Sequence, residues 1–168
     1  METLNELFED QIQDLHSAEK QLTKALPALA KKASTQSLKD AFTMHLEETK
    51  GHVERLEQIG EQCGFKVTGK TCKAMEGLVK EGEEAIDEDG DSMVVDASLI
   101  AAAQRVEHYE ISAYGTVRAL AEQLGYDIAV RLLRETQDEE SAADEKLNRI
   151  ALEELLPNAP VGEFQTQA

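Results

Sequence analysis

Residues 99–125 read LIAAAQRVEHYEISAYGTVRALAEQLG, and this stretch decides the fold. Its apolar residues recur every three or four positions, the spacing that places side chains on one face of an α-helix. Gly125 ends the pattern, as glycine often does at the C-terminus of a helix. One acidic residue, Glu110, interrupts an apolar line that otherwise runs through Leu99, Ala102, Val106, Ala113, Val117, Leu120 and Leu124. We therefore expect a long amphipathic helix with a carboxylate on its buried face.

Three further stretches show the same pattern, and each has one glutamate on its apolar face. The first begins at a capping box formed by Thr3 and Glu6 and carries Glu19. The second carries Glu48, and the last carries Glu140. The sequence therefore predicts four long helices, each with one inward-facing carboxylate.

The composition and the order of these segments predict the fold class. The 168-residue chain has three prolines and no tryptophan, and it is rich in strong helix formers. The last long helix is expected over about residues 127–155, and a connection over 64–92 carries a short amphipathic helix at 72–87. The expected fold is all-α, a ferritin-like antiparallel four-helix bundle with a long crossover that carries a short fifth helix. We expect residues 1–156 to form a single domain and residues 157–168 a polar, mobile tail.

The net charge of the chain argues against some classes of partner, and its apolar runs bear on its location. A formal net charge of −17 argues against binding to nucleic acid or to an anionic membrane, because both demand a basic face. No apolar run reaches the roughly 18 residues that a transmembrane helix needs, and the first residues do not resemble a signal peptide. We expect a cytoplasmic protein in which Cys63 and Cys72 are reduced thiols.

The four glutamates are expected to lie at one depth in the bundle. From a turn near residue 34, Glu19 lies about 15 residues back and Glu48 about 14 forward, so at ~1.5 Å per residue their heights nearly match. Glu110 and Glu140 are each about 15 residues from the second turn, at Gly125. One such glutamate is most simply a surface residue at the edge of an apolar stripe, and a buried Glu–Lys network is another alternative. Four at one depth favour a site for hard, oxygen-preferring metal ions.

Several residues one helical turn away extend this set of candidate ligands. His52 and Asp144 follow two of the glutamates by four positions, and Glu107 precedes another by three, so each pair shares a face. His45 is either a ligand or a donor that orients a carboxylate. For two non-haem metal ions per chain, iron or manganese, the predicted ligands are Glu19, Glu48, His52, Glu107, Glu110, Glu140 and Asp144. In this scheme Glu48 and Glu140 bridge the two ions.

Other polar residues near these helices have simpler interpretations. His16 and His108 are expected to be surface histidines. Tyr114 is expected to pack in the core with its hydroxyl hydrogen-bonded. Glu139 neighbours Glu140 but is rotated by about 100° around the helix, so we expect it to be solvated.

Four motifs carry a resemblance to a known family. They are SAEKQL at 17–22, HLEET at 45–49, VEHYEISAYG at 106–115 and ALAEQLGY at 119–126. These motifs resemble the YciF/YciE family of bacterial ferritin-like proteins, and the similarity extends to about residue 155. The resemblance implies a ferritin-like bundle, a homodimer, a dinuclear metal site and an association with bacterial stress. It implies no assigned reaction.

The chain departs from the general pattern of ferritin-like dimetal proteins, which is Glu-x-x-His on the second and fourth bundle helices. Gly51 and Ala143 stand where those histidines are expected. The resulting ligand set is carboxylate-rich and suits Mn²⁺, Mg²⁺ or Ca²⁺ as well as iron, or shared protons in a metal-free site. The leading hypothesis is a dinuclear iron or manganese centre that acts on O₂ or peroxide. The alternatives are a non-catalytic dimeric stress protein with a structural or vestigial metal site, and a ferritin-style storage cage.

Overall fold

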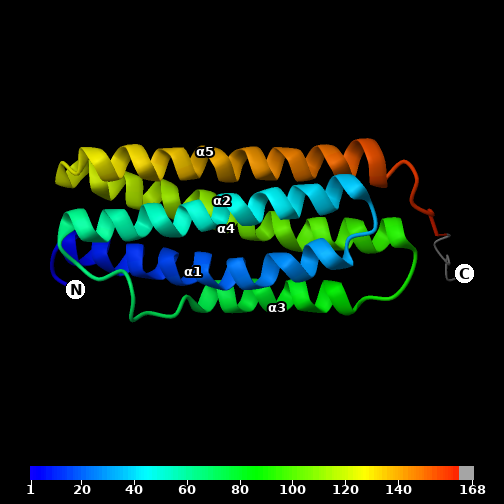
Figure 1. Ribbon diagram of the computed structural model, residues 1–168, viewed down its shortest axis with the longest axis horizontal. Coiled ribbons are helices and arrows are strands. Elements are labelled where there is room, and N and C mark those ends of the chain that lie inside the picture. The colour runs from blue at the N-terminus through cyan, green and yellow to red at the C-terminus, as the bar shows by residue number, and fades with distance from the viewer. Residues whose placement is uncertain (163–168) are drawn as a thin grey trace, which may run out of the picture.

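The computed structural model describes residues 1–162, and that part of the chain is helical with no strand (Figure 1). The predicted all-α class is therefore confirmed. Of the tail predicted at 157–168, residues 163–168 lie outside the described residues. The elements are α1 (Leu4–Lys32), α2 (Gln36–Cys63), α3 (Lys73–Asp87), α4 (Ser92–Leu124), α5 (Asp127–Ile150) and a π-helical turn, η1 (Ala151–Leu155).

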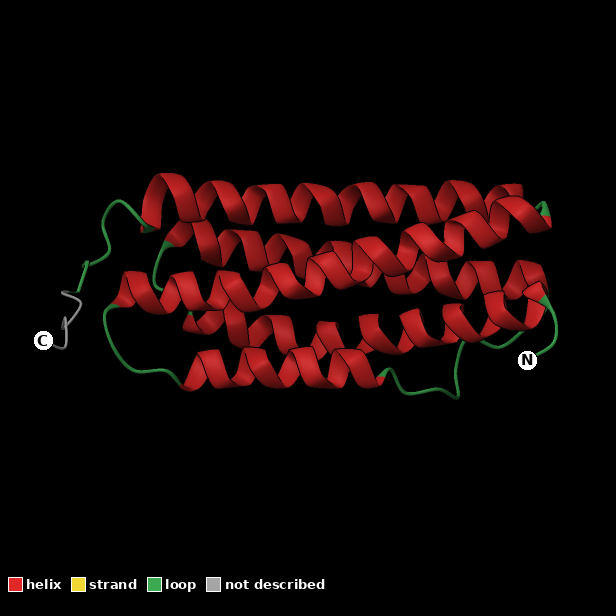
Figure 2. Cartoon of the chain, turned by 180° about the vertical axis from the view of Figure 1, so that it is seen from behind, coloured by secondary structure: helices red, strands yellow, loops and turns green. Residues whose placement is uncertain are grey.

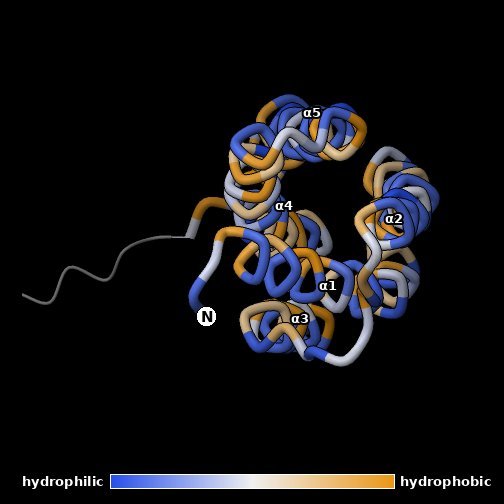
Figure 3. The backbone as a smooth tube through the Cα atoms, turned by 90° about the vertical axis from the view of Figure 1, so that its left-hand side faces the viewer, coloured by the Kyte–Doolittle hydropathy of each residue, from blue (hydrophilic) through white to orange (hydrophobic). Residues whose placement is uncertain are grey.

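Four of the helices form the bundle, and the remaining one lies outside it. The hairpins α1–α2 and α4–α5 pack against each other, with α1 beside α4 and α2 beside α5, and each neighbouring pair is antiparallel (Figure 1). The crossover between the hairpins carries α3 along the outer side of α1 and α4, as the views from behind and along the bundle show (Figures 2 and 3). This is the predicted antiparallel bundle with a helical crossover.

The helix ends lie where the sequence places them. The Thr3 hydroxyl accepts a hydrogen bond from the backbone of Glu6, and the Glu6 carboxylate binds the Thr3 backbone in return, which completes the predicted capping box. Gly64 and Gly125 end α2 and α4 with φ of 80° and 75°, a left-handed conformation that glycine adopts without steric strain. The two hairpins are therefore fixed in length, and this sets the relative heights of their side chains.

The turn between α1 and α2 is anchored by a carboxylate from another helix. Asp96 of α4 is fully buried and accepts hydrogen bonds from the backbone N–H and the hydroxyl of both Ser34 and Thr35, at 2.8–3.0 Å. The Thr35 side chain makes no capping bond of its own, so Asp96 satisfies donors at the start of α2. This contact ties the first hairpin to α4.

The apolar core is divided into two clusters along the bundle. One cluster includes Leu22, Phe42 and Leu99 and lies toward the α1–α2 turn, whereas the other includes Phe8 and Leu133 and lies toward the α4–α5 turn. A layer of buried polar side chains separates the clusters. The candidate site is this layer.

Two further expectations can be compared with the structure. Within residues 1–162, no helix is both long enough and apolar enough to cross a bilayer. Cys63 and Cys72 are both free thiols in the structure, and Cys72 is buried.

Candidate metal centre

Six buried acidic and histidine side chains from four helices make up the polar layer. None is more than 5% exposed. Helix α1 supplies one of them, α2 and α4 supply two each, and α5 supplies one: Glu19, His45, His52, Glu107, Glu110 and Glu140. All four bundle helices thus contribute to one polar site.

The side chains form two groups that share one carboxylate. In the first group, His45, Glu107, Glu110 and Glu140 each offer a ligand atom within 4.8 Å of the others. In the second group, Glu19 and His52 do the same with Glu140. A carboxylate with two oxygens, common to two adjacent groups, has the arrangement of a bridging ligand between two metal ions. The layer is therefore organised as two neighbouring sites.

The contacts inside the layer are short and mostly lack hydrogen-bond geometry. His52 Nδ1 lies 2.9 Å from Glu140 Oε1 and 3.4 Å from Glu19 Oε1. His45 Nε2 lies 3.4 Å from Glu140 Oε2 and 3.5 Å from Glu107 Oε2. Every inward ring nitrogen therefore faces carboxylate oxygens of the layer.

All six side chains contribute atoms that have no hydrogen-bond partner among the described residues. These include both oxygens of Glu110 and of Glu140, one oxygen each of Glu19 and Glu107, and the inward nitrogens of His45 and His52. Buried polar atoms are almost always paired, and leaving one unpaired costs about 1–3 kcal/mol or more when it is charged. Carboxylate oxygens and imidazole nitrogens are ligands that iron and manganese accept. The residues present therefore fit a pair of such ions.

A second ring of contacts orients one of the histidines from outside. His52 Nε2 lies 2.9 Å from a Glu139 oxygen, and Arg55 holds both oxygens of that carboxylate. Because Nε2 is committed to Glu139, Nδ1 faces Glu19 and Glu140. A carboxylate that accepts the outer N–H of a histidine is a common support for a metal ligand. The arrangement fixes the histidine in the orientation that metal binding requires.

Two other groups are held in a similar way. The Tyr114 hydroxyl, fully buried, donates a 2.5 Å hydrogen bond to Glu19 Oε1 and leaves Glu19 Oε2 unpaired. His45 Nδ1 lies 3.2 Å from Glu48 Oε2, so its Nε2 faces the layer. In each case the contact occupies one polar atom of the side chain and leaves its other polar atom, Glu19 Oε2 or His45 Nε2, without a hydrogen-bond partner among the described residues.

The pKa values in the layer are shifted by burial, by neighbouring carboxylates and by the facing histidines. Some carboxyl pKa values rise and one falls. Burial, together with nearby carboxylates, raises the pKa of Glu107 and of Glu110 well above 4.5. Burial disfavours the charged form of His52, but its contacts with Glu140 and Glu19 outweigh this and raise its pKa to about 11. Burial also opposes the charged form of Glu140, yet the facing histidines lower its pKa. In the metal-free protein the layer therefore retains protons, which entering cations must displace.

The structure brings five of the seven predicted ligands into the layer: Glu19, His52, Glu107, Glu110 and Glu140. Glu48 is 31% exposed at its side chain and touches the layer only through His45. Asp144 is 20% exposed and turns toward α4, where it accepts a hydrogen bond from Gln104 and lies 3.4 Å from His108. Glu48 and Asp144 lie outside the layer, so their role as metal ligands remains a prediction.

Sequence reasoning left the role of one member open and misplaced some neighbours. His45 belongs to the first group, and its signal was present: it lies seven residues, or two turns, before His52 on the same face. Glu139 was expected to be solvated, but Arg55 and His52 hold it partly buried. His16 was expected at the surface, yet it is 5% exposed and lies 3.2 Å from Glu57.

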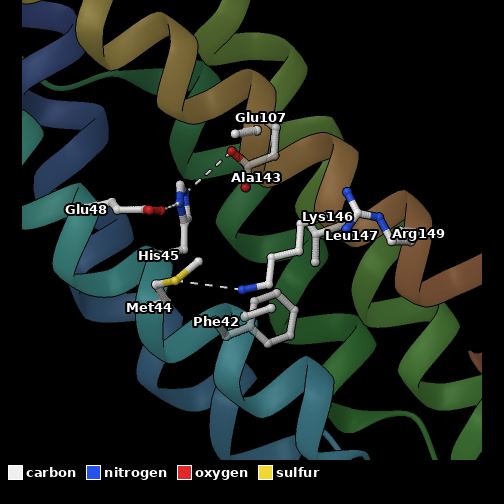
Figure 4. Close-up of a pocket in the computed structure, with 11 residues that line it drawn as sticks. Phe42, Met44, His45, Glu48, Glu107, Ala143, Lys146, Leu147 and Arg149 are labelled. Carbon is white, nitrogen blue, oxygen red and sulfur yellow. Dashed lines mark hydrogen bonds and ion pairs between the residues drawn. The ribbon is translucent and has the colours of Figure 1, made fainter.

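A pocket leads from the surface to one edge of the layer. It lies between α2 and α5, has a volume of about 270 Å³, and includes His45 and Glu107 in its lining. Figure 4 shows His45 between Glu48 and Glu107 at the inner side of the pocket, with Lys146 reaching across from α5. Small molecules can therefore approach the first group without passing through the apolar core.

Comparisons with known proteins agree with this architecture. The family described as "Domain of unknown function (DUF892)" matches residues 3–159. The chain is 50% identical over 153 residues to Protein YciF of Escherichia coli (strain K12), a match that covers 90% of this chain and 92% of that protein.

Solved structures give the same result. The crystal structure of the E. coli stress protein YciF matches with a TM-score of 0.87 over 90% of this chain and 96% of that one. YcfI from Rhodopseudomonas palustris, 45% identical, also gives 0.87, over 90% and 97% of the two chains. A protein from Xanthomonas campestris pv. campestris, 17% identical, gives 0.71 over 89% and 91% and supports the fold alone. The ferritin-like fold expected from the motifs is confirmed, and the chain belongs to the DUF892 family, the YciF/YciE family that its motifs resemble.

Proposed function

We propose that this protein is a bacterial stress protein that holds two non-haem metal ions, iron or manganese, and acts on O₂ or peroxide. The observation that carries the proposal is the buried layer of carboxylate and imidazole atoms that lack hydrogen-bond partners within residues 1–162 and form two groups sharing Glu140. Such a layer is costly without a cation, and its atoms suit these two metals. The link to stress rests on similarity to YciF, which is described as a stress protein.

The two groups define the ligands of the two ions. Glu19 and His52 would hold one ion, and His45, Glu107 and Glu110 the other. Glu140 would bridge them. Glu48, which lies against His45, and Asp144, one turn beyond Glu140, are the proposed further ligands, and each would have to turn toward the layer to bind.

Iron or manganese, when bound, supplies one-electron redox chemistry toward oxygen species. The residues of the chain perform the remaining tasks. Arg55 and Glu139 keep His52 oriented, and the Tyr114 hydroxyl holds Glu19 through the hydrogen bond that it donates. Glu107 and Glu110 retain protons when no cation is near, so they release them as positive charge enters. The two apolar clusters keep bulk water out of the layer from both ends of the bundle.

Metal analysis after anaerobic loading tests the proposal. The wild-type protein is loaded with Fe²⁺ or Mn²⁺, desalted, and assayed for metal content. We expect about two ions per chain, as in other dinuclear sites, and a severe loss in Glu140→Ala. The control is Glu145→Ala, which removes an exposed glutamate from the same helix and should leave the metal content unchanged. A wild-type content near zero at saturating metal contradicts the proposal.

Peroxide consumption by the loaded protein tests the reactive part separately. A rate above that of the same concentration of free metal supports reaction with peroxide. A rate no higher than free metal, with two ions bound, favours the alternative: a non-catalytic helical stress protein with a structural metal site. We also propose that the protein is cytoplasmic and that it forms a homodimer. Light scattering of the purified protein, which gives its molar mass in solution, tests the dimer.

A further inference from the structure

The pocket between α2 and α5 has two chemically different parts. Its inner side is formed by His45, Glu48 and Glu107, next to the first group of the candidate metal centre. Its outer part is mainly apolar and is lined by small or apolar side chains with two cations among them: Ala41, Phe42, Met44, Ala142, Ala143, Lys146, Leu147 and Arg149. An apolar cavity with a few placed polar groups is the usual form of a small-molecule site.

Two cations at this pocket lack a carboxylate partner. Although the protein has 34 acidic residues against 17 lysines and arginines, neither Lys146 nor Arg149 forms an ion pair with a carboxylate within residues 1–162. The Lys146 ammonium instead reaches across the pocket to the Met44 sulfur, at 3.8 Å (Figure 4). A thioether is a weak acceptor, so this ammonium has no strong partner and is available to an anion.

We propose that this pocket binds a small monocarboxylate with an apolar body, whose carboxylate is held by the Lys146 ammonium. The apolar body packs against Phe42, Ala143 and Leu147, and its far end points toward the His45–Glu107 edge. A cavity of about 150 Å³ holds benzene, so about 270 Å³ accommodates a body of roughly six carbons with its head group. The binding of a carboxylate is argued from the pocket alone. Only the idea that the bound molecule would meet a metal centre rests on the proposed function.

The charges of the pocket distinguish small molecules of the same size. A primary ammonium ion with the same body would be repelled by Lys146 in the orientation proposed for the carboxylate, and would have to turn toward Glu48 and Glu107 instead. A neutral alcohol would gain the apolar contacts but only neutral hydrogen bonds, which are about half as strong as those between charged groups. The pocket should therefore bind a carboxylate more tightly than an alcohol, and should bind a carboxylate and an amine in opposite orientations.

Calorimetric titration with three six-carbon probes tests these expectations. Hexanoate, hexan-1-ol and hexylamine are titrated into the metal-free wild-type protein, and amide chemical shifts locate the bound hexanoate. We expect hexanoate to bind about tenfold more tightly than hexanol, as one charge-assisted hydrogen bond provides. Shifts should be concentrated at residues 41–45 and 142–149.

Three variants give the proposal its controls. Lys146→Met removes the charge and keeps the length, and it should lower the affinity for hexanoate about tenfold but not that for hexanol. Ala143→Leu fills the apolar part and should weaken both. Lys50→Met, which removes an exposed lysine of α2 that pairs with Glu47, should change neither. Absence of hexanoate binding, equal affinities for hexanoate and hexanol, or insensitivity to both Lys146→Met and Ala143→Leu overturns the proposal.

Metal content, measured in the same samples, separates this inference from the proposed function. Lys146→Met and Ala143→Leu should bind as much Fe²⁺ or Mn²⁺ as the wild type, because neither residue belongs to the layer. Hexanoate binding without metal binding refutes the dinuclear centre and leaves the pocket assignment standing. Metal binding without hexanoate binding does the reverse.

Discussion

Replacing Glu110 by glutamine should stabilise the metal-free protein while abolishing part of its metal binding. Glu110 is fully buried, and neither of its oxygens has a hydrogen-bond partner within residues 1–162. Burial, with Glu19 and Glu140 nearby, raises the pKa of Glu110 well above 4.5. Glutamine has nearly the same shape and no charge, so the substitution removes the electrostatic penalty without leaving a cavity. Its amide can also donate to the neighbouring carboxylates.

The size of the gain depends on pH. A raised pKa in the folded state means that stability from the protonated carboxyl is fully present below pH 4.5 and is lost as pH rises toward the folded pKa. The loss is at most about 1.4 kcal/mol per pH unit for one proton. Glu110→Gln should therefore equal the wild type near pH 4.5 and exceed it by up to about 1.4 kcal/mol for each unit above. For a chain of this size that is at most roughly 3–6 °C in Tm per pH unit.

Urea and thermal unfolding of chelator-treated protein at pH 5, 6 and 7 measures this gain. Glu145→Gln, which changes an exposed glutamate of α5, should give no pH-dependent difference from the wild type. The same samples, assayed with Fe²⁺ or Mn²⁺, should show that Glu110→Gln binds less metal. If Glu110→Gln is less stable than the wild type at pH 7, or if its advantage does not grow with pH, the argument from unpaired buried carboxylates is wrong.

Three further predictions concern the surroundings of the layer. Glu139→Gln should weaken metal affinity about 10–100-fold, because loss of a carboxylate behind a ligating histidine usually does so, with little change in the unfolding free energy. Equal metal titrations of the variant and the wild type would contradict this prediction. Asp96→Asn should lower the unfolding free energy by about 2–3 kcal/mol, because an amide nitrogen replaces an oxygen that accepts from Ser34 and Thr35; urea melts measure it, and a difference below ~0.5 kcal/mol would count against the anchor. Metal affinity of the wild type should rise from pH 6 to pH 8, since protons with raised pKa values must leave Glu107, Glu110 and His52; calorimetric titrations across that range check the sign.

The fold was accessible from the sequence because its signals are local and repeated. The capping box at Thr3, the glycines at 64 and 125, and the apolar lines between them each fix one helix without reference to any other. With helix lengths fixed, hairpin arithmetic gives the heights of inward residues. That arithmetic placed Glu19, Glu110 and Glu140 in one layer, where the structure has them.

The parts of the site that sequence reasoning missed depend on rotation about helix axes and on contacts between helices. Glu48 lies on the expected face of α2, but the packing of α2 against α5 leaves it at the edge, beside His45. Glu139 is rotated away from the layer, as expected. It is nevertheless not solvated, because Arg55 on the neighbouring helix captures it. Neither outcome can be read from one helix alone.

The two halves of the layer differ in charge, and this difference has a structural cause. The group near α1, which contains Glu19, His52 and Glu140, carries an ion pair. The raised pKa of His52 and the lowered pKa of Glu140 favour an imidazolium beside a carboxylate. Near α4, the raised pKa values of Glu107 and Glu110 favour neutral acids. The neutral half is also the half that the α2–α5 pocket reaches. A cation that reached the layer from this side, past Lys146, would first meet carboxyl groups able to exchange a proton for it, and Glu140, which belongs to both groups, links them to the ion-paired half.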